Sequence, residues 1–273
     1  MTLYEIVQAA IRDISEHGFD TQKRVQDWVA KIKAAAEREM MPQARLDALL
    51  KESLKGIYTR LITEGGVTKM NPGVSRFTIK NVAPRARAEL NRRIMMSANL
   101  IKLNRENAMA DTLRRFEGWA SSVPAGGSKV QDKREETANV RKAITSLPFT
   151  ERRVLIDQGH KLTASINSVV AQDGGAIAAE WNSNVGRTGY DHRPKHLARN
   201  GRIFLIRNSW AHEKGFVKPG SDGYTDEIED VAELPYCSCF YRFLYSLRKL
   251  PDDMITQKGR DEQARVRAEM MAS

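Results

Sequence analysis

Two short segments dominate this chain: R-T-G-Y-D-H-R-P-K-H-L-A-R-N-G-R-I-F-L-I at residues 187–206, and P-Y-C-S-C at 235–239. The stretch from Arg187 to Cys239 contains both cysteines and three of the five histidines. The chain before it has mainly helical patterns, and one charged segment follows it. We therefore expect any specific function to lie in this stretch, or in the way the helices carry it.

The first of these segments predicts a helix followed by a strand. Pro194 suits the first turn of a short helix that runs to Asn200, and Gly201 suits its end. Residues 202–206 are apolar and β-branched enough for a strand that packs on a core. A turn cluster follows at 218–223. This part of the chain is therefore expected to be a small α+β module.

The preceding sequence predicts helices. Apolar residues recur at helical spacing from Leu3 to Ile14, with Gly18 as the terminating residue and Thr21 as a cap for the next helix. A third helix is expected to start at Pro42. Residues 74–80 alternate and predict a short strand, and a long basic helix is expected from Pro84 to about Trp119. Another helix is expected to open at Pro148, with Thr150 as its N-cap. The fold class predicted is mainly α, with a helical N-terminal region and a small α+β C-terminal module.

Composition shifts predict four segments. Residues 1–120 form a helical region, either a bundle or an extended arm. The Ser-, Gly- and Pro-containing residues 121–128 are the clearest linker. Residues 129–250 hold helices that lead into the α+β module, and 251–273 are expected to form a charged helical tail.

Composition also limits the class of protein. The 273 residues carry a formal charge of +10 with a pI near 9.6, which favours nucleic acid, an anionic surface or an acidic partner. No apolar run is long enough for a membrane span, and the first residues lack a signal-peptide pattern. Two cysteines two positions apart are not a disulfide framework. Synthesis in a reducing cytoplasm, with no membrane partner and no cofactor, is the expectation.

Basic residues gather in two places. Residues 84–115 hold eight Lys or Arg and three acidic residues, and 187–218 hold eight against two, which gives net charges of +5 and +6. Phosphate contacts are one use for such clusters. The acidic run from Asp222 to Glu233 is expected to pair with the second cluster, within one chain or between neighbours. The candidate DNA-contacting residues are Arg85, Arg87, Arg92, Arg93, Arg199 and Arg202.

A zinc site is a weaker candidate. Cys237, Cys239, His192 and His196 would supply two sulfurs and two nitrogens, a set that zinc accepts. The histidine spacing fits structural zinc sites, whereas C-x-C is shorter than the usual C-x(2–4)-C. The alternative is that both cysteines are strand residues packed in the core beside Tyr236 and Phe240. No metal ligand is assigned on this evidence.

Catalytic arrangements are alternatives without a local signature. Cys237 with His196 or His160 would make a thiol nucleophile and its base. His192, His196, Asn208 and His212, with Asp191, would make a nuclease-like metal site. No catalytic residue is assigned.

An ordered series of residues resembles the phage Mu F-like head morphogenesis family, also called minor head or minor capsid proteins. The resemblance covers about residues 150–245, and where the family ends in a sequence such as N-C-R-C this chain has Y-C-S-C. The matching positions are Trp181, Arg187, Asp191, Arg193, His196, Gly201, Phe204, Pro219, Gly220, Cys237 and Cys239.

The resemblance implies a structural, non-enzymatic component of a tailed-phage virion near the portal vertex, made in the host cytoplasm. It implies a role in head assembly or head-to-tail connection, as a portal-bound adaptor or minor head protein, and in DNA passage. Expected partners are the portal protein and other virion proteins, copies of itself in a ring, and packaged DNA. Arg193, His196 and Asp191 are expected to hold the helix-to-strand turn. A cytosolic nucleic-acid-binding protein and a metal-dependent nuclease-like enzyme are the alternatives.

Overall fold

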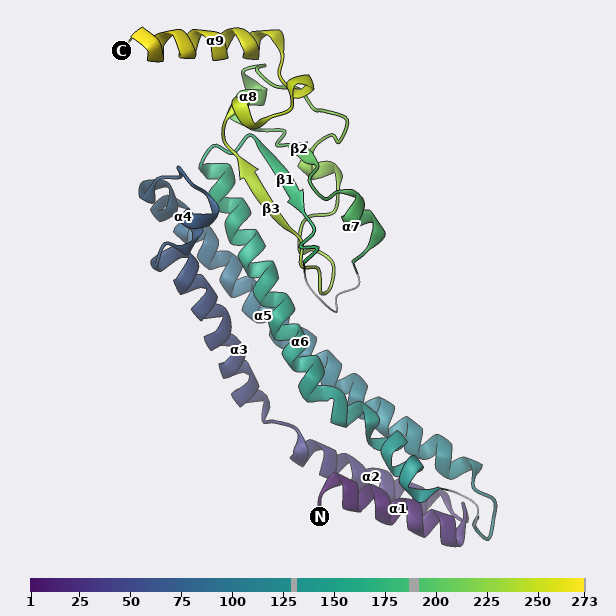
Figure 1. Cartoon of the computed structure of the whole chain (residues 1–273). Helices are drawn as coiled ribbons and strands as arrows, with labels where there is room; N and C mark the ends of the chain where they lie inside the picture. Colours follow the sequence, from purple (N-terminus) through teal and green to yellow (C-terminus); the bar gives the residue numbers. More distant parts are fainter. Residues whose placement is uncertain (129–131, 187–191, 273) are drawn as a thin grey trace. The chain divides into compact units, whose positions relative to one another are not determined.

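A computed structural model describes residues 1–128, 132–186 and 192–272. Helices make up most of these residues, and a small three-stranded antiparallel sheet lies in the C-terminal region (Figure 1). The prediction of a mainly α chain with a small α+β C-terminal module is confirmed. Within the described residues, no helix combines the length and apolar character that crossing a membrane requires.

The helices and strands have the following bounds. The helices are α1 (Leu3–His17), α2 (Gln22–Glu39), α3 (Gln43–Tyr58), α4 (Gly66–Met70), α5 (Arg76–Ser122), α6 (Lys133–Asp173), α7 (Pro194–Ala198), α8 (Trp210–Glu213) and α9 (Gln257–Ala272). The strands are β1 (Ala178–Asn182), β2 (Ile203–Leu205) and β3 (Phe240–Leu244). Short helical turns of other types lie at Thr59–Thr63, Thr225–Glu227, Leu247–Lys249 and Asp252–Met254.

The chain forms two compact units, and each contains separate stretches of sequence. The first comprises residues 1–51 and 95–155, and the second comprises 52–94 and 156–273. The segment 121–128, predicted as a linker between domains, connects α5 to α6 inside the first unit. It packs against the end of α1, where the Ser128 amide donates to the Ser15 carbonyl at 2.9 Å.

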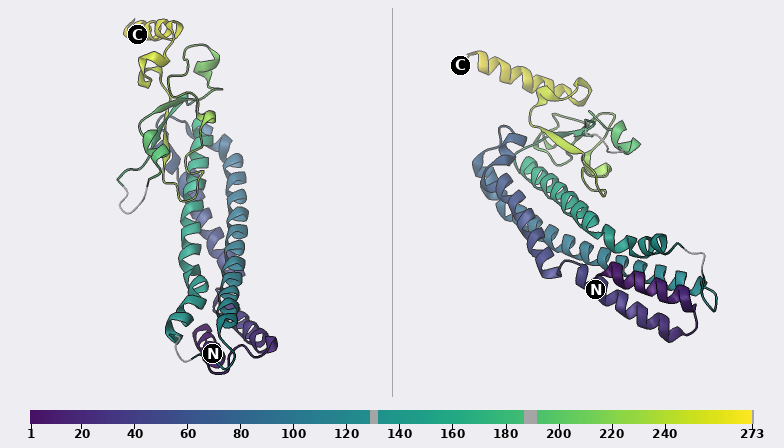
Figure 2. Two further views of the ribbon diagram at one scale, coloured as in Figure 1. Left: turned by 90° about the vertical axis from the view of Figure 1, so that its right-hand side faces the viewer. Right: turned by 60° about the horizontal axis from the view of Figure 1, so that its bottom comes forward.

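The first unit is a helical bundle whose core joins α1, α2 and parts of α5 and α6 (Figure 2). Leu3, Val7 and Ile14 are fully buried in it, as the helical spacing predicts. Thr2 and Thr21 cap α1 and α2, and the turn between these helices uses Gly18 at φ +75°. A Cβ atom at Gly18 would meet the Pro124 carbonyl oxygen at 2.3 Å. Glycine is therefore required here by both backbone conformation and space.

Three sequence predictions about the long helices are wrong. Residues 74–80 do not form a strand, because Ser75 caps α5 through the Thr78 amide at 3.1 Å and the buried residues Ile79 and Val82 continue its apolar face. Pro84 therefore lies inside α5 and does not start it. Pro148 lies inside α6, and Thr150 does not cap a helix there, since its hydroxyl donates to the Ser146 carbonyl one turn back.

The second unit contains the sheet, with strand order β2-β1-β3 (Figure 1). Alternate residues of β1 enter two different cores, as the two-residue period of a strand requires. Ala179 and Trp181 pack with Phe204, Tyr241 and Phe243. Ala178 packs with Leu205 and Leu244 on the opposite face. Both faces of this small sheet are thus covered by apolar side chains.

A buried polar network ties α4, α6 and the end of β3 together within the second unit. The Asn71 amide donates to the Asn167 side-chain oxygen at 2.6 Å, and the Tyr245 hydroxyl donates to the Asn71 side-chain oxygen at 2.6 Å. Asn71 is 0% exposed and Asn167 is 4% exposed. Because buried amides need partners, this network fixes the geometry of the segments it joins.

We predict that Gly18→Ala destabilises the first unit much more than Gly126→Ala does. Both glycines have positive φ, but a Cβ at Gly126 meets no atom within 4 Å. The control change Gly126→Ala should lower the free energy of unfolding by about 1 kcal/mol, from backbone strain alone. Gly18→Ala adds a backbone clash and should cost about 3 kcal/mol. Urea unfolding measures both, and equal costs would contradict the close approach.

We predict that Asn71→Ala destabilises the second unit more than Tyr245→Phe. The alanine removes both hydrogen bonds of the network and leaves the buried Asn167 side-chain oxygen without its donor, for a cost of about 3 kcal/mol. Phenylalanine at 245 keeps the ring and removes one hydroxyl, for a cost of about 1 kcal/mol. Thermal and urea unfolding test the order. A larger effect of Tyr245→Phe would show that the network does not depend on Asn71.

Candidate functional site

Five of the residues that carry the sequence resemblance meet in one buried cluster of the second unit. Trp181 comes from β1, His196 from α7, Phe204 from β2, and Cys237 and Cys239 from the segment just before β3. Their exposed fractions are 0%, 2%, 3%, 2% and 4%. Five residues spread over 59 positions of sequence thus share one interior. We call Trp181, His196, Cys237 and Cys239 the imidazole–thiol cluster.

His196 lies at the centre of the imidazole–thiol cluster. Its Nδ1 atom is 3.5 Å from the Cys237 sulfur and 3.4 Å from the Cys239 sulfur. Its ring meets the Trp181 ring edge-on, with centroids 5.2 Å apart. Its Nε2 atom faces the Glu229 carboxylate at 3.7 Å. The ring therefore has sulfur on one side, a carboxylate on the other and an aromatic face beside it.

A short relay of hydrogen bonds fixes α7 against β1. The Trp181 indole nitrogen donates to the Ser183 hydroxyl at 3.1 Å, and that hydroxyl donates to the His196 carbonyl at 2.5 Å. Gly201, at φ +77°, ends the α7 segment and donates its amide to the Trp181 carbonyl at 2.8 Å. Only glycine adopts this conformation without strain. The position of His196 is therefore set by β1 as well as by its own helix.

The segment that carries the cysteines is held from α6. The Asp157 carboxylate accepts from the Tyr236 amide at 2.6 Å and pairs with Lys161 at 3.1 Å. Arg193 donates to the Pro235 carbonyl at 2.9 Å. Tyr236 has a φ of +61°, a turn conformation that directs the chain into the two cysteines. These contacts hold the cysteine segment against α6 and the start of α7.

The two thiols affect each other's ionisation. A hydrogen bond from Cys239 stabilises the Cys237 thiolate and lowers the pKa of Cys237. The same bond raises the pKa of Cys239, and burial raises it further. Both cysteines are free, and the pair is therefore suited to hold one negative charge between its sulfurs.

The larger sequence-predicted sets come together only in part. Of the zinc set, the ligand atoms of His196, Cys237 and Cys239 lie within 4.8 Å of one another, and His192 is not in that group. Among the described residues, this is the one group of three or more possible metal-binding side chains. Arg187 and Asp191, and with them the expected Asp191 contacts, lie outside the described residues.

The thiol–imidazole pair of the catalytic alternative is present for His196 but buried. His160 is exposed and lines a cavity beside Cys239. His212 belongs to a separate contact, with its Nε2 atom 3.2 Å from the Tyr224 hydroxyl. The nuclease-like set of His192, His196, Asn208 and His212 does not gather among the described residues.

The candidate DNA-contacting arginines have partners inside the protein. Arg85 pairs with Asp173, Arg202 with Asp222, and Arg199 with Glu229. Arg87 stacks over the Tyr58 ring. Arg92 and Arg93 share Glu89. Burial opposes ionisation of Glu89, but these two hydrogen bonds outweigh it and hold the pKa of Glu89 below its ordinary value.

The acidic run and the second basic cluster pair within the chain. Arg199, Arg202 and Arg207 bind carboxylates at Glu229, Asp222, Asp226 and Glu227. Of the two arrangements that the sequence allowed, the intramolecular one is present. The two pairs of Arg207 are exposed and contribute little stability singly. Together, the pairs of the three arginines fix the loop that carries Glu229 beside His196.

Sequence reasoning missed three residues of the site. Glu229 was noted as one member of an acidic run, with no sign that it faces an imidazole. Ser183 lies two residues after Trp181, and Asp157 lies on a helix far from the cysteines in sequence. Only the last had a signal, since an acidic residue within the apolar face of α6 requires a buried partner.

Comparisons with protein-family models, curated proteins and solved structures found no match to this chain.

Proposed function

We propose that this protein is a structural component of a tailed-phage virion near the portal vertex. It acts in head assembly or head-to-tail connection, as a portal-bound adaptor or a minor head protein, and contributes to DNA passage. The observation that carries the proposal is the convergence of the resemblance residues. Trp181, His196, Phe204, Cys237 and Cys239 are positions of the resemblance to the Mu F-like family, and they share one buried cluster.

The convergence supports the proposal because residues that fit a sequence pattern by chance are not expected to cluster in the fold. An isolated C-x-C or H-R-P-x-H pattern has little specificity, as many chains contain one. Here the segments of the pattern come from three strands or their ends and one short helix. These residues contact one another and so stabilise the α+β module. The fold class also agrees with the helical region and α+β module that the resemblance implies.

Exposed apolar side chains on α5 support a role in assembly. Met96, Leu100 and Leu103 recur at helical spacing and are 52%, 38% and 54% exposed. They lie in the first unit, which is otherwise a bundle with a buried core. A row of exposed apolar side chains on a helix is typical of a surface that docks on another protein.

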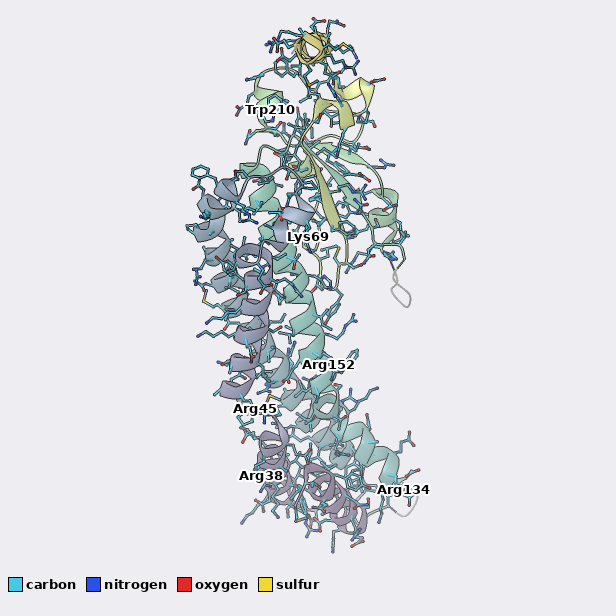
Figure 3. All side chains as sticks on the ribbon, turned by 60° about the vertical axis from the view of Figure 1, so that its left-hand side comes forward. Arg38, Arg45, Lys69, Arg134, Arg152 and Trp210 are labelled. Atoms are coloured by element: carbon cyan, nitrogen blue, oxygen red, sulfur yellow. The ribbon has the colours of Figure 1, made fainter. Side chains whose placement is uncertain are left out.

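The charges favour protein contact over DNA binding as the main function. The candidate DNA-contacting arginines all have intramolecular partners, so phosphate binding would require partner exchange. The paired acidic and basic runs are likewise satisfied inside one chain, so ring contacts between copies must use other surfaces. Figure 3 shows other arginines that project from the helices of the first unit, among them Arg38, Arg45, Arg134 and Arg152. Because exposed arginines suit phosphate contacts, DNA binding remains the alternative function.

We predict that the full chain joins a portal ring at a fixed stoichiometry, measured by light scattering of the mixture. The double change Leu100→Gln and Leu103→Gln should weaken this association about tenfold or more, because it removes apolar contact area. Lys102→Gln is the matched control: it introduces the same residue between them and removes a charge, and association should persist.

Three results would contradict this proposal. Absence of any association, with tight DNA binding that weakens steeply with salt, would favour the nucleic-acid-binding alternative. Equal binding by the double variant and the wild type would exclude the α5 surface as the docking site. DNA cleavage that needs a divalent metal and is lost in His196→Ala would favour the nuclease-like alternative.

A further inference from the structure

We propose that His196 Nδ1 and the sulfurs of Cys237 and Cys239 bind one zinc ion. This inference concerns the interior of the second unit and does not depend on the proposed virion function. It rests on five features: the ligand distances, the surplus of sulfur around one nitrogen, the position of the cysteines in the chain, the carboxylate behind the histidine, and a path for the ion.

The distances fit a shared tetrahedral ion. Zinc lies about 2.3 Å from a thiolate sulfur and about 2.0–2.1 Å from an imidazole nitrogen. Two such ligands at a tetrahedral angle are then about 3.6 Å apart. The two sulfur–nitrogen distances in the cluster are 3.5 and 3.4 Å. Both sulfur–nitrogen distances therefore suit a shared ion, and all three ligand atoms lie within 4.8 Å of one another.

Hydrogen bonding to His196 does not explain why both sulfurs lie equally close to one nitrogen. A neutral imidazole has one acceptor nitrogen, with one lone pair in the plane of the ring. It can accept a good hydrogen bond from one thiol. Two sulfurs face Nδ1 at nearly equal distances, so only one of them can donate to it, and Cys239 bonds the Cys237 sulfur as well. A cation placed between the three atoms uses both sulfurs and the nitrogen equally.

The C-x-C spacing suits this geometry although it is shorter than the common zinc spacing. In an extended segment, residues i and i+2 point to the same side. Cys237 and Cys239 immediately precede β3 and pack in the same apolar core as Trp181. Both sulfurs therefore reach one side of the chain, where α7 presents His196. The third ligand comes from a separate segment, so its sequence spacing carries no constraint.

The outer contacts match those of a zinc-binding histidine. Such a residue commonly directs its second ring nitrogen at a carboxylate, which fixes the tautomer and makes the ligand nitrogen more basic. The His196 Nε2 atom is buried, makes no hydrogen bond in the described structure, and faces Glu229 at 3.7 Å. Arg199 holds Glu229 at 3.2 Å and stacks over Trp181. The carboxylate is thereby positioned for this role.

Charge and access also favour zinc. Two thiolates and one Zn²⁺ are together neutral, which reduces the cost of burying them. Sulfur and imidazole ligands select zinc over magnesium or calcium, which prefer oxygen. A cavity of about 230 Å³, lined by Cys239, Asn167 and Tyr241 among others, reaches the cluster. It has room for several water molecules, so it offers a route for the ion and a source for its fourth ligand.

The first test measures metal in the full chain, purified without a polyhistidine tag from zinc-supplemented cells under reducing conditions. Elemental analysis should give one zinc per chain. Cobalt substituted for zinc should show the thiolate-to-cobalt charge-transfer band of a tetrahedral site. Because the chain has only two cysteines, that band can arise only from Cys237 and Cys239. Removal of the metal by a chelator should lower the thermal midpoint of unfolding.

Substitutions of the proposed ligands test which residues bind the zinc. Cys237→Ser, Cys239→Ser and His196→Asn should each lose stoichiometric zinc, and Glu229→Gln should bind it about ten- to a hundredfold more weakly in chelator competition. His17→Asn, which changes an exposed histidine of the first unit, is the matched control and should retain one zinc.

Two outcomes overturn the proposal. One is a folded, fully reduced wild-type chain that holds no zinc and gives no charge-transfer band with cobalt. The other is one zinc per chain that survives in both Cys239→Ser and His196→Asn. If a ligand variant fails to fold, the cobalt spectrum of the wild type still decides the question.

Discussion

The second unit depends on one buried imidazole that contacts three different segments. His196 meets two sulfurs through one nitrogen, faces a carboxylate with the other, and packs its ring against Trp181. A polar ring in an apolar core is costly unless its atoms have partners. Its neighbours are therefore constrained together: α7 and the cysteine segment cannot shift independently without separating Nδ1 from the two sulfurs.

Further hydrogen bonds in the second unit stabilise these contacts of His196. The relay from Trp181 through Ser183 fixes α7 on β1, and Asp157 holds the cysteine segment from α6. The ion pairs of the acidic run also stabilise these contacts, because Arg199 holds Glu229 beside His196. Exposed ion pairs contribute little energy, but they select one conformation of a long loop.

Much of the local structure could be predicted from the sequence. Gly18 as a helix end, Thr21 as a cap, the short helix at Pro194 and the strand at 203–205 all follow from local rules and are present. The helix at 76–83 could not be predicted from alternation alone. A strand needs a partner strand to satisfy its backbone, and none lies beside this segment in the sheet. The helix satisfies its backbone internally and buries Ile79 and Val82.

The sequence by itself determined the fold class, the Thr21 cap and the candidates Trp181, His196, Cys237 and Cys239, because these depend on neighbours along the chain. Tertiary structure alone decided that α5 and α6 continue through Pro84 and Pro148, because buried packing outweighs a lost backbone hydrogen bond. It also decided that His196 meets Cys237 and Cys239 and excludes His192 from that group. Residues about forty positions apart meet only when a sheet and a helix bring them together, and no local rule encodes that distance.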